Sequence, residues 1–593
     1  MLAALEADAP GLPAVLDRLR REDALGQLVE RRGRMAELAT EAGDVKLDWV
    51  DGVARALADG AAVDGVGELA AWIRATGARH LVWSGMGGSV QTVHALRGAG
   101  LLDGAGMAIH PLDSTDPAAL NRLLRAIAPD GDLGAGLSRT IVVAVSMGMT
   151  SEEPVTHLEW FDGLLREHRV TGAHDRFLVM TLPGSSLDSF AQRRGIRRVD
   201  LQLDGHSHTP GRMSAPATRV FLLPAALALP DGGLRGVLEQ CQSEHRLAPS
   251  LDVGGRDAAA ASDPFVRLAA WLGVQMDEGR DLLLLDLPER WRPLAPWVEQ
   301  VVEESLGKGG CGLLVFPGQD LASAGGWPDR HAVLRFDEGG PGAPAPARPV
   351  ATLRLGAATG RAGRLAMAAR FFAGWELTVA VLGYLRGITF AGQPAVEAYK
   401  RHARELRMAD GPLPYPSGAL AVAAGGRLVL DASGLPGAGS GDPASVLADV
   451  ARTVLARGQL AYLDLTINAD PDAPAWDRLR AEALHLGNRV LRRPVKLRSG
   501  PRDYHSTEQS ETDGPPGVLS LRVLVRRTEP VVAGDYAMRF LHAQALGTVR
   551  AMREAGRPPL LAVIEEPADA DLLADALRRA GELLVDQHMR TWG

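Results

Sequence analysis

The sequence contains little cysteine, no excess of basic charge and no long uninterrupted apolar run. Its two cysteines, Cys241 and Cys311, lie far apart among the 593 residues and lack the spacing of metal ligands. Neither a disulfide framework nor a zinc site is therefore predicted, and this cysteine usage fits a reducing compartment. The formal net charge of -8 gives no broad basic surface, so nucleic acid and anionic membranes are not expected partners.

The N-terminal sequence shows no targeting signal. The start, MLAALEADAPGLPAVLDRL, has neither the basic nor the apolar segment of a signal peptide, and no run of about 18 apolar residues occurs. We therefore expect a cytoplasmic protein without a membrane span. The chain is 46% hydrophobic and 23% charged, which is typical of globular proteins, and its 593 residues predict two or three domains.

Two kinds of periodicity divide the chain. Up to about residue 75, leucine, alanine and valine recur at three- and four-residue spacing, which predicts a helical leader. From about residue 78, apolar runs, glycine-rich or polar turns and amphipathic stretches alternate, which indicates strands and helices in a mostly parallel sheet. A second such cycle has predicted strands at 282–286 and 312–316, and the composition of 337–349 predicts a surface loop.

The C-terminal part is also predicted to be folded. The stretches 458–471 and 517–527 resemble strands on either side of a helix, which indicates a compact α/β unit. The predicted fold class is α/β, with two doubly wound parallel-sheet domains of three αβα layers. We expect a helical leader at 1–75, the two domains at 76–230 and 231–405, and a C-terminal α/β segment at 406–593.

A glycine-rich turn, LVWSGMGGSVQT at 81–92, follows the first predicted strand and contains Gly85, Gly87, Gly88 and Ser89. Such a turn presents backbone N–H groups and a hydroxyl at the positive end of a helix, which favours phosphate binding. The turn does not fit the GxGxxG pattern of dinucleotide-binding proteins. A strand-to-helix turn that needs glycine only for tight packing explains the pattern equally well.

A second turn, VVAVSMGMTSEEP, follows another apolar run and brings Ser146, Thr150 and Ser151 ahead of a predicted helix. Hydroxyl groups in this position are often only helix caps. Since ligands of parallel sheets bind at the carboxyl ends of the strands, two such turns are also expected to converge. The pair therefore favours a phosphorylated small molecule as the ligand.

Six short motifs occur in an order that resembles phosphoglucose isomerases. GMGGS and SMGMTSEEP are similar to the family's GIGGS and SKTxTTxET turns. The motifs PGRMS, EESLGK, FAGQPAVEAYK and HSTEQ resemble its arginine, glutamate, lysine and histidine motifs and contain Arg212, Glu304, Lys400 and His505. FFAGWELTVAVLG, GPRDYHSTEQ and AQALG look most like the isomerase half of bacterial transaldolase/phosphoglucose isomerase fusions. The resemblance covers about residues 75 to 555 and implies two sugar-isomerase domains.

The resemblance implies an aldose-ketose isomerase that interconverts glucose 6-phosphate and fructose 6-phosphate without cofactor or metal. Glu304 would transfer the proton between carbons, Arg212 would stabilise the enediolate, and His505 and Lys400 would act in ring opening. The implied substrate-binding residues are Gln393 for the sugar and Gly87, Gly88, Ser89, Ser146, Thr150 and Ser151 for the phosphate. Family members form dimers, so a homodimer is implied, although the histidine motif comes later in this chain.

Helical spacing over 297–306 places Val298, Val301 and Val302 on one face, with Glu304 on its flank and Glu303 nearer to solvent. Without the family motif, Glu304 and Lys400 would each be interpreted as a charge on a solvated helix face.

The sequence also departs from the family. Met147 and Gly148 replace a lysine and a threonine, so one charge and one hydroxyl for the phosphate are missing. The aspartate of the FDQ motif is absent in FAGQ, and Glu508 and the segment SETDG at 510–514 add acidic groups near the predicted phosphate site. These changes favour an alternative hypothesis, a divergent sugar-phosphate binding or regulatory protein on the same scaffold. Transaldolase activity is not expected, because roughly 75 residues before the first motif are too few for a barrel of about 250.

Overall fold

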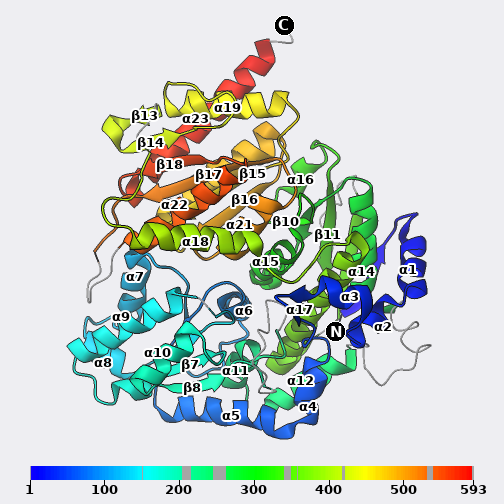
Figure 1. The fold of residues 1–593 in the computed structure, drawn as a ribbon, viewed down its shortest axis with the longest axis vertical. Helices are drawn as coiled ribbons and strands as arrows, with labels where there is room; N and C mark the ends of the chain where they lie inside the picture. Colours follow the sequence, from blue (N-terminus) through cyan, green and yellow to red (C-terminus); the bar gives the residue numbers. More distant parts are fainter. Residues whose placement is uncertain are drawn as a thin grey trace.

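The computed structural model describes residues 2–149, 151–203, 215–244, 262–338, 349–356, 358–416, 421–530 and 538–590. In this part of the chain, three large sheets and one short hairpin are covered by helices. Figure 1 shows the first sheet and its helices in blue to cyan, the second mainly in green and the third in colours from yellow-green to red. The predicted α/β class with parallel sheets is confirmed.

The first sheet is entirely parallel and buried on both faces. In spatial order its strands are β5 (Ala108–Leu112), β4 (His80–Ser84), β6 (Thr140–Val145), β7 (Phe177–Thr181) and β8 (Arg197–Asp200). Its helices are α6 (Gly88–Gly98), α7 (Pro117–Ile127), α8 (Leu133–Ser138), α9 (Glu153–Glu167) and α10 (Ser186–Arg194). Along β4, Leu81 and Trp83 face one core and Val82 the other, as expected for a sheet between two helical layers.

The second sheet contains the strands predicted at 282–286 and 312–316. Its order is β1 (Leu2–Ala7), β12 (Val350–Leu355), β11 (His331–Asp337), β9 (Leu282–Asp286) and β10 (Leu314–Pro317). The described helices that follow β8 in this part of the chain are α11 (Arg219–Ala228), α12 (Gly233–Glu244), α14 (Pro264–Asp277), α15 (Ala295–Leu306), α16 (Leu321–Ala324) and α17 (Gly360–Arg386). All strands except β1 run parallel. Most of the loop predicted at 337–349 lies outside the described residues.

The leader is not purely helical, so that prediction is corrected. It contains α1 (Leu12–Arg21), α2 (Ala24–Val29), α3 (Gly33–Leu38), α4 (Gly52–Ala58) and α5 (Gly60–Ala75), but also a hairpin of β2 (Thr40–Glu41) and β3 (Asp44–Val45). Its first residues form β1, which pairs antiparallel with β12. The unpaired edge of β12 offers hydrogen bonds that outweigh the modest helix preference of alanine and leucine.

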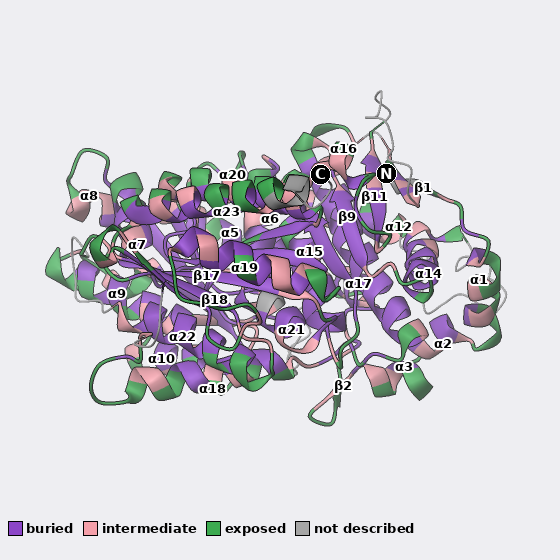
Figure 2. Cartoon of the chain, turned by 90° about the horizontal axis from the view of Figure 1, so that it is seen from above, coloured by how far each residue is buried: buried purple, intermediate pink, exposed green. Residues whose placement is uncertain are grey.

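One helix of the described residues, α17, is long and apolar enough to cross a membrane by length and composition. Its apolar window of 18 residues is completely buried inside the protein, and Figure 2 shows the helix in the buried colour within the body. The helix packs against α14, α12 and α15. It therefore forms the centre of the core that joins the leader to the first two sheets.

The third sheet is built from the C-terminal part. In spatial order it contains β13 (Ala421–Ala423), β14 (Leu428–Asp431), β18 (Leu560–Ile564), β17 (Val518–Val525), β15 (Tyr462–Asn468) and β16 (Val495–Gly500). The last four run parallel. Its helices are α18 (Pro394–Met408), α19 (Pro443–Ala456), α20 (Asp477–His485), α21 (Tyr504–Asp513), α22 (Arg539–Glu554) and α23 (Ala570–Arg590). The strands predicted at 458–471 and 517–527 are thus confirmed, whereas the domain boundaries at 76, 231 and 406 stay predictions.

Two glycines of α17 provide a test of its central packing. A Cβ atom on Gly374 would lie 2.2 Å from the ring of Phe265, whereas one on Gly363 would meet no atom within 3.7 Å. We expect Gly374→Ala to lower the free energy of unfolding by about 1–3 kcal/mol through overpacking. Gly363→Ala, in the same helix, should leave stability unchanged or raise it by about 0.5–1 kcal/mol. Chemical unfolding followed by circular dichroism measures the free energy of unfolding of both variants. Equal changes in the two would contradict this description of the core.

Candidate active site

A cleft of about 330 Å³ lies where the three sheets and the leader hairpin meet. In Figure 1, α6, α15 and α21, one helix from each sheet region, come together near the middle of the molecule. The described lining residues are Glu41, Ala42, Asp44, Lys46, Met86, Gly88, Ser89, Met147, Gly148, Met149, Ser151, Gln300, Glu304, Gln393, Glu397, Lys400 and His505. The leader and the regions of all three sheets therefore contribute residues to one site.

The first predicted turn connects β4 to α6 and forms one wall of the cleft. Gly87 has a φ of 57°, and a Cβ atom there would lie 2.8 Å from Gln300 Nε2 and 2.9 Å from the His505 ring. Ser89 Oγ accepts a hydrogen bond from Met86 N at 3.1 Å, which closes the turn. Glycine is therefore required both by the backbone conformation and by the close approach of two cleft side chains.

The second predicted turn follows β6, the direct neighbour of β4, so the two turns converge as predicted. Met147, Gly148, Met149 and Ser151 line the cleft beside Gly88 and Ser89. Ser146 is buried, and its Oγ donates to Gly148 O at 2.8 Å. Its hydroxyl therefore supports the turn, and the structure does not bring it to the cleft wall.

Glu304 is a buried carboxylate at the wall of the cleft. Gln300, one helical turn earlier on α15, donates from Nε2 to Glu304 Oε2 at 3.0 Å. On the other side, His505 Nδ1 lies 3.5 Å from Glu304 Oε1. The side chain of Glu304 is 4% exposed and that of His505 is 15% exposed. The carboxylate and the imidazole are thus held together, with the imidazole more open to the cleft.

Glu303 is fully buried, so the expectation that it lies nearer to solvent was wrong. It forms ion pairs with Lys496 and with Arg498, the latter at 2.9 Å, and accepts from Ser510 Oγ at 2.8 Å. Burial raises the pKa of Glu303, but the charges of Lys496 and Arg498 outweigh burial and hold that pKa below its ordinary value. The helix spacing alone did not reveal this, because the partners come from the third sheet.

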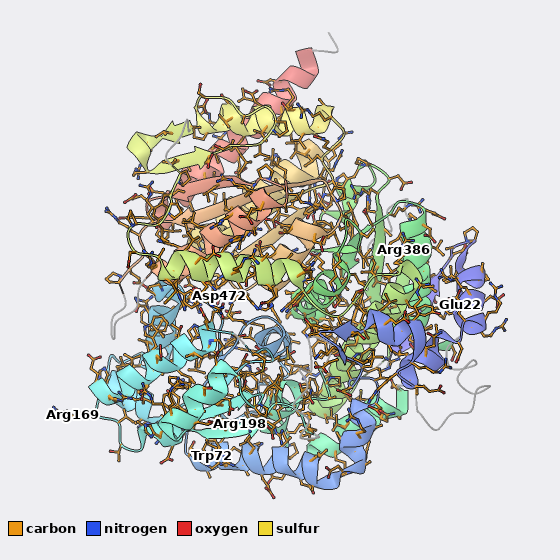
Figure 3. The ribbon with its side chains drawn as sticks, viewed as in Figure 1. Glu22, Trp72, Arg169, Arg198, Arg386 and Asp472 are labelled. Atoms are coloured by element: carbon orange, nitrogen blue, oxygen red, sulfur yellow. The ribbon has the colours of Figure 1, made fainter. Side chains whose placement is uncertain are left out.

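The N-terminus of α21, which carries His505, is fixed to the first sheet. Arg502 donates from Nε and Nη2 to the two carboxylate oxygens of Asp113 at 2.7 and 3.0 Å. Gln91 Nε2 on α6 donates to Asp503 Oδ1 at 3.1 Å. Asp472, labelled in Figure 3 where the third sheet region borders the first, also pairs with Arg502, at 3.1 Å. These contacts bring the histidine of the C-terminal part beside the glycine-rich turn of the same chain.

Helix α18 contributes two of the predicted residues. Gln393 is the residue before its first turn, and Lys400 Nζ donates to Glu397 Oε1 at 3.1 Å. Both line the cleft. The buried Oε1 of Gln393 has no hydrogen-bond partner in the described part of the chain. A polar ligand in the cleft would supply one.

The additional acidic residues do not face the cleft, which corrects the expectation from the sequence. Glu508 and Glu511 are buried and both bind Arg522, at 2.6 and 2.9 Å. Asp513 Oδ1 accepts from Gly309 N at 3.1 Å. Helical geometry turns these side chains away from His505, so they do not repel a bound phosphate directly.

Two predicted residues, Arg212 and Thr150, lie outside the described residues. Among residues that are described, no group of three or more His, Cys, Asp or Glu side chains is arranged to hold a metal ion. Sequence reasoning missed Gln300, Glu41 and Lys46. Gln300 was detectable as the residue four positions before Glu304 on the same helix face, whereas the leader hairpin gives no motif.

No family model matches the chain. Curated glucose-6-phosphate isomerases match part of the chain. Glucose-6-phosphate isomerase is another name for phosphoglucose isomerase. The protein from Prochlorococcus marinus (strain MIT 9313) is 30% identical over 266 residues, which are 43% of this chain and 43% of that protein. The protein from Synechococcus sp. (strain JA-3-3Ab) is 29% identical over 260 residues, 43% of this chain and 45% of that protein. The resemblance to phosphoglucose isomerases is confirmed.

The match with these isomerases spans less than half the length of the curated proteins. A solved glucose-6-phosphate isomerase from Chlamydia trachomatis superposes with a TM-score of 0.51 at 16% identity, covering 69% of this chain and 89% of that one. A hypothetical protein from Thermus thermophilus gives a TM-score of 0.53 at 21% identity, covering 68% of this chain and 100% of that one. These two structures support the shared fold. The special likeness to fusion proteins stays a prediction.

The close approach at Gly87 predicts that Gly87→Ala lowers kcat/KM about 100-fold, because the new methyl group displaces Gln300 and His505 from Glu304. Gly77→Ala is the matched control, since Gly77 also has a positive φ of 70° but no atom near its Cβ position. Gly77→Ala should lose stability by about 1–2 kcal/mol and keep its kinetics. Steady-state kinetics and unfolding curves of the two variants check these expectations. Equal losses of kcat/KM in Gly87→Ala and Gly77→Ala would refute the role of the close approach.

The Asp113–Arg502 pair predicts a pH-dependent contribution to stability. Burial raises the pKa of Asp113, but the charges of Arg502 and His94 outweigh it and hold that pKa well below its ordinary value. Because the folded pKa is lower than the unfolded one, the stabilisation is present above about pH 4 and is lost as the pH falls further.

We expect Asp113→Asn to lower the free energy of unfolding at pH 7 by about 3–5 kcal/mol, since Arg502 loses its buried partner. The difference from wild type should narrow below about pH 4. Asp472→Asn removes a more exposed partner of the same arginine and should cost about 1 kcal/mol or less. Urea unfolding between pH 7 and pH 3 measures this, and a difference independent of pH would contradict the assignment.

Proposed function

We propose that this protein interconverts glucose 6-phosphate and fructose 6-phosphate by proton transfer on Glu304. The observation that carries the proposal is the pairing of a buried carboxylate with an imidazole at the wall of a cleft, beside a glycine-rich helix N-terminus. This arrangement suits a sugar phosphate, because a helix N-terminus attracts phosphate while the carboxylate removes a proton from carbon. Partial identity to glucose-6-phosphate isomerases supports the same substrate.

Ring opening is the first chemical step. The bond between C1 and the ring oxygen breaks while a proton is added to that oxygen and another leaves the C1 hydroxyl. His505 is the proposed group for this transfer, because an imidazole can donate and accept protons near neutral pH. Lys400 lines the same cleft and would contact the ring oxygen as a hydrogen-bond donor.

Isomerisation follows on the open chain. Glu304 removes the proton from C2, which leaves an enediolate, and the proton on O2 moves to O1 while Glu304 returns its proton to C1. Gln300 keeps the carboxylate oriented through its 3.0 Å hydrogen bond. We assign Arg212 to the stabilisation of the enediolate charge, because a guanidinium provides fixed donors for a developing oxyanion.

The phosphate is proposed to bind between the two turns. The donors proposed for it are the backbone N–H groups of Gly88 and Ser89 and the hydroxyl of Ser151, with Thr150 as a further proposed contact. The hydroxyl of Ser89 itself donates to Met86 O at 2.7 Å and so supports the turn. Gln393 is proposed to bind the sugar, since its buried Oε1 lacks a partner among the described residues. No cofactor takes part in the proposed reaction.

A second candidate function is a sugar-phosphate binding or regulatory role. It is favoured by Met147 and Gly148, which line the wall where the related isomerases have a charged and a hydroxyl side chain. The two functions differ in whether the bound sugar phosphate turns over.

Glu304→Gln tests the proposed reaction. We expect kcat for the conversion of fructose 6-phosphate to fall about 100- to 10,000-fold, because the amide cannot accept the carbon-bound proton. Glu304→Asp keeps the carboxylate but moves it away from the substrate, because its side chain is one methylene shorter. Its kcat should lie between those of Glu304→Gln and the wild type. A coupled assay of glucose 6-phosphate formation provides the rates.

Thermal shifts with fructose 6-phosphate verify that each variant still folds and binds. Undiminished turnover in Glu304→Gln would refute the assigned base. Binding without turnover in the wild-type protein would support the regulatory role and refute the isomerase proposal.

A further inference from the structure

The chain uses lysine very sparingly. Four of its 64 lysine and arginine residues are lysines, and all four are described by the structure: Lys46, Lys308, Lys400 and Lys496. Lysine and arginine differ chemically, because lysine presents a compact ammonium group and arginine a broad planar fork. In a chain that otherwise relies on arginine, the positions of the four lysines indicate where a compact cation is required.

All four lysines lie in or beside the candidate active site. Lys496 is buried against Glu303, the neighbour of Glu304. Lys308 Nζ donates to the carbonyl oxygens of Thr389 and Ala391, just before Gln393, at 2.7 and 2.8 Å. Two of the lysines therefore have supporting roles, whereas Lys400 and Lys46 line the cleft itself.

Lys46 is positioned by the leader hairpin. The hairpin reverses at Ala42 and Gly43, with φ values of 51° and 88°, and Lys46 N donates to Ala39 O at 2.9 Å at its base. This base is joined to the segment before α18, because Phe390 N donates to Leu38 O at 2.9 Å. Figure 2 shows the hairpin, labelled β2, projecting from the body. The fixed base holds Lys46 at the cleft wall although the tip is exposed.

The ammonium group of Lys46 is available to an anionic ligand. Its side chain is 11% exposed, and its one partner among the described residues is Asp44, at 3.3 Å, whose side chain is 50% exposed. Because the Asp44 carboxylate is half-exposed to water, its ion pair with Lys46 contributes little to stability, and replacing Asp44 by a phosphate costs little. The described lining otherwise offers one ammonium group, Lys400, against the carboxylates of Glu41, Asp44, Glu304 and Glu397.

We propose that Lys46 binds the phosphate group of the substrate, so that the leader supplies a charge to a site otherwise built from the three sheets. This inference rests on the proposed function, because it takes the ligand to be a sugar phosphate. A dianion in a cleft with this many carboxylates requires cations within hydrogen-bond distance. Met147, on the turn after β6, provides no cation, whereas the leader hairpin provides Lys46.

Equilibrium binding tests this role separately from catalysis. Titration calorimetry with fructose 6-phosphate and with inorganic phosphate is compared between wild type and Lys46→Met. We expect both dissociation constants to rise about 10- to 100-fold, because one charged hydrogen bond is lost. Binding of unphosphorylated fructose should not change. If the wild-type protein binds fructose 6-phosphate without turning it over, the proposed reaction fails while this test stays valid.

Three further variants sharpen the result. Lys46→Arg keeps the charge but replaces the compact ammonium with a broad guanidinium, so it should recover only part of the affinity. Asp44→Asn removes the competing carboxylate and should lower the dissociation constant. Arg34→Met removes an exposed charge of the same leader, stacked over Tyr384 outside the cleft, and should leave binding unchanged. In an active protein, Lys46→Met should raise KM with kcat nearly constant. Unchanged phosphate affinity in Lys46→Met, or an equal loss in Arg34→Met, would overturn the proposal.

Discussion

The buried ion pairs of Glu303 with Lys496 and Arg498 hold the candidate site together. They join α15, which flanks the second sheet, to β16 of the third sheet, and all three side chains are almost completely excluded from solvent. Breaking a buried pair is costly, because the remaining charge loses its compensation. Since neighbouring residues of a helix point about 100° apart, fixing Glu303 against the third sheet directs Glu304 towards the cleft.

The site depends on the relative placement of all three sheets. The first contributes two turns at the ends of adjacent parallel strands, where ligands of such sheets commonly bind. The second contributes the carboxylate on α15, and the third contributes the imidazole at the start of α21. Because one chain supplies all three, the cleft contains a carboxylate, a histidine and the glycine-rich turn without a residue from a second copy.

The sequence predicted the local features of this arrangement and missed those that depend on distant contacts. Strands at 282–286 and 517–527 and the turn at Gly87 follow from apolar runs and glycine spacing, which are local signals. The strand at Leu2–Ala7 was missed, because its conformation is determined by pairing with β12, which lies far along the chain. The burial of Glu303 was missed for the same reason, since its partners lie far along the chain.

The proton transfer assigned to Glu304 is tested most directly by running the reaction in deuterium oxide. Fructose 6-phosphate is incubated with the protein, and the glucose 6-phosphate formed is analysed by NMR for deuterium on C2. Because a carboxyl group exchanges its proton with solvent, the account predicts deuterium on C2 in a measurable fraction of the product. It also predicts that Glu304→Gln forms this product about 100- to 10,000-fold more slowly. Glucose 6-phosphate that contains no deuterium, or that forms equally fast without the carboxylate, would contradict the account.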